Sequence, residues 1–331
     1  MPELLYRVPF DAADLVREHP PQFRHPHKGG LFEVAYPNGA VASSRLEVTQ
    51  WKRGNLGPLT LTTPLAIDVQ PNFYDYAPVG DSPHCVEWHV NFADPRLFAA
   101  YGSSLFAQDE MQVAEHPLLG SVREALLARG LDAMTRSDSG STPILIRNVE
   151  RRIEVQTNAD ASAGRPAGLY GNLFAAANFE TIRKATRRID PPSFTNIIAI
   201  AAPVGGRGEY SDSDIDYVLQ TAVIGFSAAR EESARFTTDP IQIVVHSGFW
   251  GCGAFGGNRR LMIALQVLSA HAAEIDRIVF HAGTAAGVEE VQRGIAAAES
   301  LATRCGSPCS LNKLVGRCSL LGYRWGVSDG N

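Results

Sequence analysis

Segments with strand and helix patterns alternate regularly through the second half of this 331-residue chain, and this alternation restricts the folds available to it. The expected strands cover 196–203, 241–246 and 277–281, and the expected helices cover about 211–235, 258–275 and 286–303. Such alternation is typical of a sheet with helices on both of its faces. The sequence therefore predicts an α/β fold.

A glycine-rich stretch, "HSGFWGCGAFGGNRRLM", joins the strand 241–246 to the next helix. Its Gly251-x-Gly253-x-x-Gly256 spacing lets a backbone come close to a ligand, and unpaired N–H groups with the helix dipole attract anions. A tight turn that only packs a helix on a sheet would show the same pattern. The context favours a phosphate site but does not exclude this turn.

The same spacing occurs in dinucleotide-binding oxidoreductases, where a following strand ends in an acid that holds the ribose. Here "RIVFH" (277–281) ends in His281-Ala282-Gly283, and Glu274 and Asp276 precede that strand. The dinucleotide interpretation therefore fails, and no cofactor is predicted.

Composition limits the remaining classes. The length fits two domains or one large α/β domain with extensions. A net charge of -5 gives no reason to expect nucleic-acid binding, and no apolar run approaches the ~18 residues that span a membrane. The first residues show no basic stretch followed by an apolar core, and the five cysteines are sparse, so we expect free thiols and a cytoplasmic location. Cys305, Cys309 and Cys318 lack a convincing fourth ligand, so no metal is predicted.

The first half of the chain is less regular. Residues 1–35 are rich in Pro, His and charge and predict an irregular lead-in with one short helix at 11–18. Further expected elements are an extended segment at 59–69, a strand at 85–92, a helix from about Ala107, a helix at 121–129, strands within 143–155 and a helix at 178–188.

A second unusual stretch follows the strand 85–92: "VNFADPRLFAAYGSSLFAQDEMQVAEHP". Small residues at 102–104 precede Asp109 and Glu110, which lie at an expected helix N-terminus. Carboxylates in that position often only complement the helix dipole. A buried acid beside a flexible loop is also suited to general acid catalysis, because burial raises its pKa toward neutrality.

Together the two stretches resemble the poly(ADP-ribose) glycohydrolases, a branch of the macrodomain fold. "GFWGCGAFGG" is similar to that family's diphosphate loop, and "VNFAD…GSS…QDE" is similar to its V-D-F-A-N, triple-glycine and Gln-Glu-Glu signature. The resemblance implies a macrodomain-like mixed sheet between helices over residues 59–331. Residues 1–58 would form an N-terminal extension and accessory segment.

The resemblance also implies roles for individual residues. Glu110 matches the catalytic Glu, Asp109 its neighbour, and Asp94 a ribose-contacting Asn. Phe255 would pack beneath the terminal ribose. The remaining expected substrate-binding residues are Gly102, Ser103, Ser104, Gln108, Ser247, Gly248, Phe249, Trp250, Gly251, Cys252, Gly253 and Ala254.

The departures from the family pattern all fall around the bond to be broken. Gly102-Ser103-Ser104 replaces the triple glycine, and Asp94 replaces the Asn. We therefore expect an ADP-ribosyl hydrolase that binds ADP-ribose and an ADP-ribosylated protein. Arginine is the favoured linkage, because paired carboxylates can hold a guanidinium. Hydrolysis of the polymer and non-catalytic binding of ADP-ribose stay open as alternatives.

Overall fold

A computed structural model describes residues 2–37, 42–79, 84–235 and 239–330. In chain order its elements are β1 (Glu3–Asp11), α1 (Ala12–Glu18), α2 (Pro26–Ala35), β2 (Arg45–Lys52), β3 (Ala66–Gln70), β4 (Cys85–Phe92), α3 (Gln108–Glu115), α4 (Leu118–Ala128), β5 (Arg136–Ser137), β6 (Gly140–Ser141), β7 (Ile144–Val155), α5 (Leu173–Ala176), α6 (Phe179–Lys184), β8 (Thr186–Ile200), α7 (Asp212–Ala234), β9 (Gln242–Gly248), α8 (Arg259–Ala272), β10 (Arg277–His281), α9 (Ala285–Cys305) and α10 (Leu311–Ser319).

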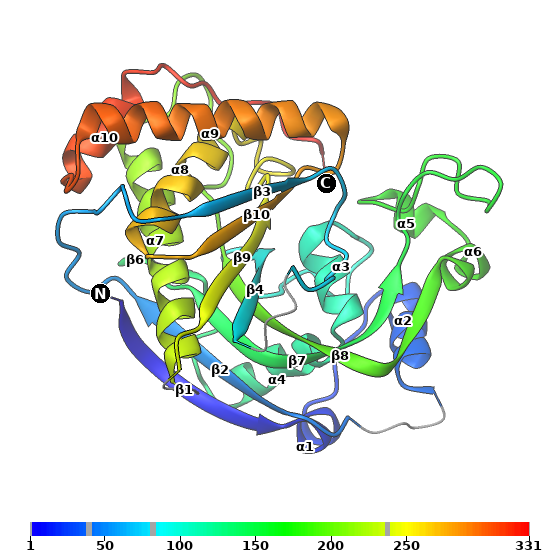
Figure 1. Cartoon of the computed structure of the whole chain (residues 1–331). Helices are drawn as coiled ribbons and strands as arrows, with labels where there is room; N and C mark the ends of the chain where they lie inside the picture. Colours follow the sequence, from blue (N-terminus) through cyan, green and yellow to red (C-terminus); the bar gives the residue numbers. More distant parts are fainter. Residues whose placement is uncertain (1, 38–41, 80–83, 236–238, 331) are drawn as a thin grey trace.

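Eight strands form one mixed sheet in the order β1-β2-β7-β8-β4-β9-β10-β3 (Figure 1). The strands from β8 to β3 are parallel, whereas β1, β2 and β7 join the sheet by antiparallel pairing. The carboxyl ends of β4, β9, β10 and β3 consequently meet at one edge of the sheet.

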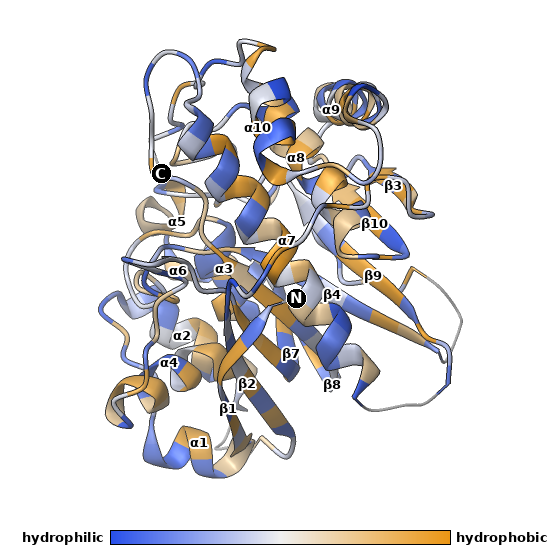
Figure 2. Ribbon diagram, turned by 90° about the vertical axis from the view of Figure 1, so that its left-hand side faces the viewer, coloured by the Kyte–Doolittle hydropathy of each residue, from blue (hydrophilic) through white to orange (hydrophobic). Residues whose placement is uncertain are grey.

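Helices cover both faces of this sheet because its central strands are apolar on both sides. Along β8, Ile197 and Ala199 belong to one buried cluster, and Ile198 and Ile200 to the other. The first cluster lies under α1–α4 and α6, and the second lies under α7–α10. Strands β9 and β10 between these layers are largely hydrophobic (Figure 2). The predicted α/β class, a mixed sheet between helices, is confirmed.

The short helix expected at 11–18 is confirmed as α1, whereas the irregular lead-in expected elsewhere in residues 1–35 is wrong at 3–11 and 26–35. Residues 3–11 form β1, which pairs with β2, and residues 26–35 form α2, which packs against α3 and α6. The "HPHKGG" stretch starts α2 with Pro26 in its first turn, and the Nδ1 of His25 accepts from the backbone N–H of His27 at 3.4 Å. Proline is well tolerated in a first helical turn, so its presence did not exclude a helix.

One other expected element has different bounds. The helix expected at 178–188 is confined to 179–184, because residues from Thr186 onward pair with β7. The boundary proposed at residue 58/59 stays a prediction. Strand β2, on its N-terminal side, pairs with β7 in the main sheet.

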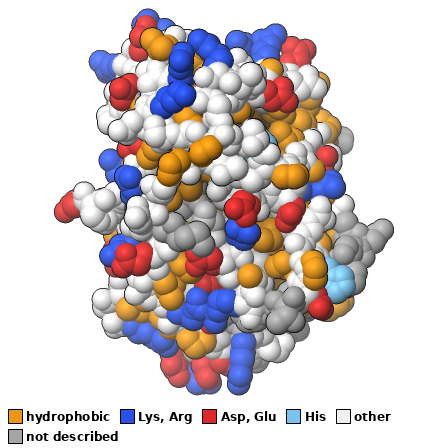
Figure 3. Space-filling view, turned by 60° about the vertical axis from the view of Figure 1, so that its left-hand side comes forward, with side chains coloured by type: hydrophobic (Ala, Val, Ile, Leu, Met, Phe, Trp, Pro, Cys, Tyr) orange, Lys and Arg blue, Asp and Glu red, His pale blue; other side chains and the backbone are white. Residues whose placement is uncertain are grey.

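On the face of the molecule seen in Figure 3, acidic and basic side chains lie side by side. All five cysteines are free thiols, as expected, and Cys305, Cys309 and Cys318 are buried. Within the described part of the chain no group of three or more His, Cys, Asp or Glu is arranged to hold a metal ion. Across the same residues, no helix has the length and apolar character needed to cross a membrane.

Candidate active site

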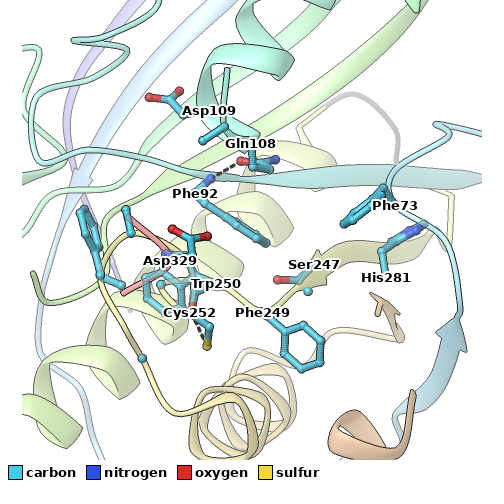
Figure 4. Close-up of a pocket in the computed structure, with 18 of the residues that line it drawn as sticks. Phe73, Phe92, Gln108, Asp109, Ser247, Phe249, Trp250, Cys252, His281 and Asp329 are labelled. Carbon is cyan, nitrogen blue, oxygen red and sulfur yellow. Dashed lines mark hydrogen bonds between the residues drawn. The ribbon is translucent and has the colours of Figure 1, made fainter. Parts of the chain in front are cut away.

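A cavity of about 910 Å³ opens at the carboxyl ends of the parallel strands (Figure 4). It is lined by residues that follow β4, β9 and β10, by the start of α3, and by the segment 326–329. Ligands of open α/β sheets bind at this edge, and the volume lies toward the upper end of small-molecule sites. The cavity brings the glycine loop and the three expected carboxylates into one site.

The glycine loop, residues 247–257, connects β9 to α8. Its fixed point is Trp250, which is fully buried and donates its indole N–H to the carbonyl of Ile200 at 3.0 Å. Gly251 adopts φ +73, and a Cβ there would lie 2.4 Å from the Cβ of Ala202. Both the backbone angle and the close contact require glycine.

The loop presents free N–H groups to the cavity. Among the hydrogen bonds of the described residues, none has the backbone N–H of Gly253, Ala254 or Phe255 as its donor. Asn258 then caps α8 by accepting from the N–H of Leu261 at 3.1 Å, so the loop leads directly into a helix N-terminus. Three unpaired amides beside such a terminus form an anion cradle.

Arg259 also lines the cavity at the start of α8, and its guanidinium lies 4.8 Å from the ring centre of Phe249. The neighbouring Arg260 is engaged elsewhere, in two hydrogen bonds of 2.7 and 3.0 Å to Glu290. Arg259 is therefore a cation at the glycine loop that the sequence analysis did not identify.

The segment 326–329 crosses the glycine loop. Gly326 donates its N–H to the carbonyl of Gly256 at 2.8 Å, and Asp329 donates to that of Gly253 at 3.4 Å. A Cβ added to Gly253 would lie 3.1 Å from Asp329 Oδ2. Figure 4 shows this carboxylate beside Trp250 and Cys252. A negative charge thus lies at the loop predicted to bind phosphates, which nothing in the sequence indicated.

The opposite side of the cavity is the N-terminus of α3. Gln108 fixes it to β4, because its Oε1 accepts from the N–H of Phe92 at 2.8 Å and its Nε2 donates to the carbonyl of Val90 at 3.2 Å. Gln108 therefore positions the helix and lines the cavity as well.

The two expected catalytic carboxyls, Asp109 and Glu110, are only 6% and 4% exposed. Asp109 Oδ1 accepts from the Asn91 side chain at 3.0 Å, and Glu110 Oε2 accepts from the backbone N–H of Ala107 at 3.0 Å. Burial raises the pKa of Asp109 well above its usual range, with repulsion from Glu110 as the next cause. Burial also raises the pKa of Glu110, opposed mainly by Lys28. Both carboxyls line the cavity, so the pair can hold a proton there at higher pH than ordinary acids.

Asp94, the third expected carboxylate, lines the cavity with its side chain 40% exposed. Its Oδ1 accepts from the backbone N–H of Arg96 at 2.9 Å. It therefore differs from the buried pair in being open to solvent and to a ligand.

Gly102, Ser103 and Ser104 do not lie in the cavity lining. Gly102 instead meets the N-terminal segment: its carbonyl accepts from the N–H groups of Arg24 and His25 at 2.8 and 3.0 Å. A Cβ at Gly102 would lie 2.2 Å from the carbonyl oxygen of Gln22. The small-residue loop serves this contact, and its placement does not support a ligand-binding role.

The far end of the cavity is aromatic. Phe73, Tyr74 and Tyr76 enter from the loop after β3, and Phe249 and His281 from the ends of β9 and β10. Of these five residues, Phe249 was among the expected substrate-binding residues. The loop residues were missed because "PNFYDYAP" reads only as a turn-rich connection.

Comparison with known proteins bears on this site. Residues 168–289 match the family model described as poly(ADP-ribose) glycohydrolase (PARG), macro domain fold. The matched region contains the glycine loop, and α3 with its carboxyls lies outside it. No curated protein matches the chain.

Solved structures of poly(ADP-ribose) glycohydrolases are also similar. The enzyme from Thermomonospora curvata has 16% identity and a TM-score of 0.46, over 87% of this chain and 93% of that one. The enzyme from Deinococcus radiodurans in complex with ADP-ribose has 14% identity and a TM-score of 0.41, over 88% and 94%. The family match confirms the resemblance drawn from the glycine loop: residues 168–289 are similar to the macro domain fold of the poly(ADP-ribose) glycohydrolases.

Proposed function

We propose that this protein hydrolyses the glycosidic bond through which ADP-ribose is attached to another group. The observation that carries the proposal is that one cavity has two chemically different ends. Unpaired amides and a helix N-terminus lie at the glycine loop, and two buried carboxyls lie at the start of α3. ADP-ribose needs both, since it contains a diphosphate and a reactive ribose.

In this proposal the three amides of the loop bind the diphosphate, and Phe255 packs beneath the terminal ribose. Both Phe255 and the loop line the cavity. The diphosphate held there also stabilises the positive charge that develops on the anomeric carbon and ring oxygen.

The buried pair performs the proton transfers. The protonated carboxyl donates its proton to the leaving oxygen or nitrogen as the bond to the anomeric carbon breaks. The ionised carboxylate takes a proton from water, whose oxygen forms the new bond to that carbon. The raised pKa of Asp109 and of Glu110 makes a proton available at higher pH than an ordinary carboxyl would.

Two linkages are candidates. The family match favours the ribose–ribose bond of the polymer. Arginine-linked ADP-ribose is the second candidate, favoured by Asp94, an additional open carboxylate beside the buried pair. A guanidinium leaving group would donate its N–H groups to paired carboxylates, whereas a ribose hydroxyl needs no such paired negative charge.

Incubation of the purified chain with polymer and with arginine-, glutamate- and serine-linked ADP-ribose tests the proposal, with free ADP-ribose measured by chromatography. Release from polymer alone assigns the first linkage, and release from the arginine adduct assigns the second. Asp94→Asn should selectively slow only the arginine reaction. Binding of ADP-ribose without release from any substrate would overturn the hydrolase and identify a binding module. The cytoplasmic location stays a prediction, to be tested by fractionation.

A further inference from the structure

Residues 326–330, here called the strap, cross the glycine loop, and the proposed chemistry gives them no role. All five are exposed to solvent, and Val327 is 92% exposed. Gly326, Val327 and Asp329 nevertheless line the cavity. A segment that buries so little surface is held in place by few interactions and opens at low cost in free energy.

The residues just before the strap are anchored more firmly. The carbonyl of Tyr323 accepts from the N–H of the buried Tyr210 at 2.9 Å. Trp325 donates its N–H to the carbonyl of Gly208, also at 2.9 Å, and its ring stacks on that of Tyr210 with 4.1 Å between the ring centres. Movement of the strap can therefore leave this anchor intact.

The contacts of the strap weaken along its length. Gly326 donates its N–H to the carbonyl of Gly256 at 2.8 Å, an ordinary hydrogen bond. Asp329 donates to the carbonyl of Gly253 at 3.4 Å, which is longer than the usual range for such a bond. The strap thus has a fixed start and a weakly bonded middle, which is the arrangement of a segment that can swing away from the loop.

The strap places a carboxylate at the loop that is proposed to hold the diphosphate. A Cβ added to Gly253 would lie 3.1 Å from Asp329 Oδ2, and one added to Gly256 would lie 3.0 Å from the backbone nitrogen of Ser328. Figure 4 shows the Asp329 carboxylate inside the cavity. Two anions repel one another at such distances. A diphosphate on the unpaired loop amides and the carboxylate in its present place therefore exclude one another.

We propose that the strap is an internal competitor of the substrate: it covers the glycine loop when no ligand is bound, and binding of a diphosphate releases it. Trp325 stays in place as the fixed side of the hinge. The apparent affinity for ADP-ribose is then lowered by the fraction of molecules in which the strap is closed. This inference rests on the proposed function in one respect, the placement of the diphosphate on the glycine loop.

A disulfide that locks the strap provides the first test. In Gly253→Cys/Asp329→Cys the new Cβ at 253 would lie 3.8 Å from the position of Asp329 Cγ, so a small movement of the exposed strap lets the sulfurs join. The variant oxidised with glutathione disulfide should bind ADP-ribose at least about tenfold more weakly than the same protein reduced with dithiothreitol, measured by calorimetry.

The two single variants, Gly253→Cys and Asp329→Cys, are the matched controls. Their affinities should not depend on the redox state, and the second also tests for a bond to the native Cys252. Equal affinity of the oxidised and reduced double variant would overturn the proposal, because ligand would then bind with the strap closed.

Relaxation of ¹⁵N-labelled backbone amides in the wild-type chain provides a second readout that needs no substitution and no turnover. Without ligand the strap should be ordered. With ADP-ribose or inorganic pyrophosphate the order parameters of residues 327–330 should fall below about 0.6, while that of Trp325 stays near about 0.85. Pyrophosphate is included because it carries the anion without the ribose.

The outcomes separate the strap from the proposed function. Release of the strap by either ligand, without turnover of any substrate, would support the strap and overturn the hydrolase. A strap that is disordered without ligand, or that stays ordered with ADP-ribose bound, would overturn the strap alone. Binding of neither ligand would overturn both.

Discussion

At the scale of single residues, the site depends on two carboxyl groups whose pKa is raised by burial. Asp109 and Glu110 are consecutive in α3, and neighbouring helical residues point about 100° apart. They therefore contact different partners, Asn91 for one and the Ala107 backbone for the other. The sequence indicated that these acids begin a helix, but it did not reveal α2, which packs against that helix.

Glu110→Gln and Asp109→Asn should separate turnover from binding. Each removes one titratable proton with little change in shape, so kcat should fall by about 10²-fold or more. Affinity for ADP-ribose should stay within about tenfold, or ~1.4 kcal/mol. Single-turnover rates and calorimetry measure the two quantities. Equal losses of binding and of turnover would show that the acids hold the ligand and do not move protons.

Asp329→Asn should strengthen the binding of ADP-ribose. The carboxylate lies beside Gly253, so it repels a diphosphate placed on the loop amides. We expect a gain of up to about tenfold at low salt, ~1.4 kcal/mol, that shrinks as salt is added. Asp138→Asn, an exposed change outside the cavity lining, is the control. Weaker binding by Asp329→Asn would mean that this carboxylate contacts the ligand favourably.

At the scale of elements, the regular second half of the chain could be predicted and the first half could not. The alternation over 196–303 corresponds to β8, α7, β9, α8, β10 and α9, because buried parallel strands and long amphipathic helices have strong periodic patterns. Strand β1 and helix α2 have weak patterns, with Pro and His residues, and are stabilised by tertiary contacts. The loop 71–79 also has no pattern that indicates a site, and it lines the cavity because the fold brings it there from a distant part of the sequence.

Gly102→Ala should show how much the N-terminal segment contributes to the site. The added methyl would lie 2.2 Å from the Gln22 carbonyl oxygen, and backbone must move to admit it. We expect a loss of about 1–3 kcal/mol in the free energy of unfolding, measured in urea, with reduced turnover as α2 shifts. Gly57→Ala, where no atom lies within 4 Å, should be nearly neutral. Equal stability of the two variants would contradict this packing.

At the scale of the whole molecule, a group of buried histidines joins the central strands. His89 of β4 stacks on His246 of β9 at 4.2 Å, and His246 Nδ1 lies 3.1 Å from His281 Nε2 of β10. Burial lowers the pKa of His89 well below its usual range, that of His281 to about 4 and that of His116 to about 3. At these histidines the folded protein therefore binds fewer protons than the unfolded chain does.

The free energy of unfolding should consequently fall as the pH drops below about 6.5, the usual histidine pKa. Each histidine kept neutral in the folded state costs up to about 1.4 kcal/mol per pH unit until its folded pKa is reached. The raised pKa values of Asp109 and Glu110 act oppositely, since they reduce stability above about pH 4. Urea unfolding between pH 5 and 8 measures the slope, and His89→Phe should reduce it. His19→Phe, a substitution at the C-terminal end of α1, should leave the slope unchanged. A slope unchanged by His89→Phe would contradict this account.

The central claim is that the glycine loop binds the diphosphate of ADP-ribose while the start of α3 lies at its reacting carbon. A crystal structure of the Glu110→Gln variant with ADP-ribose tests it most directly. The account predicts phosphate oxygens on the amides of Gly253, Ala254 and Phe255, with Asp329 displaced. It also predicts the side chain at 109 or 110 near the anomeric carbon, in contact directly or through one water. The claim is contradicted if the side chains at 94, 109 and 110 all lie more than ~7 Å from that carbon, because no proton could then be transferred to the leaving group.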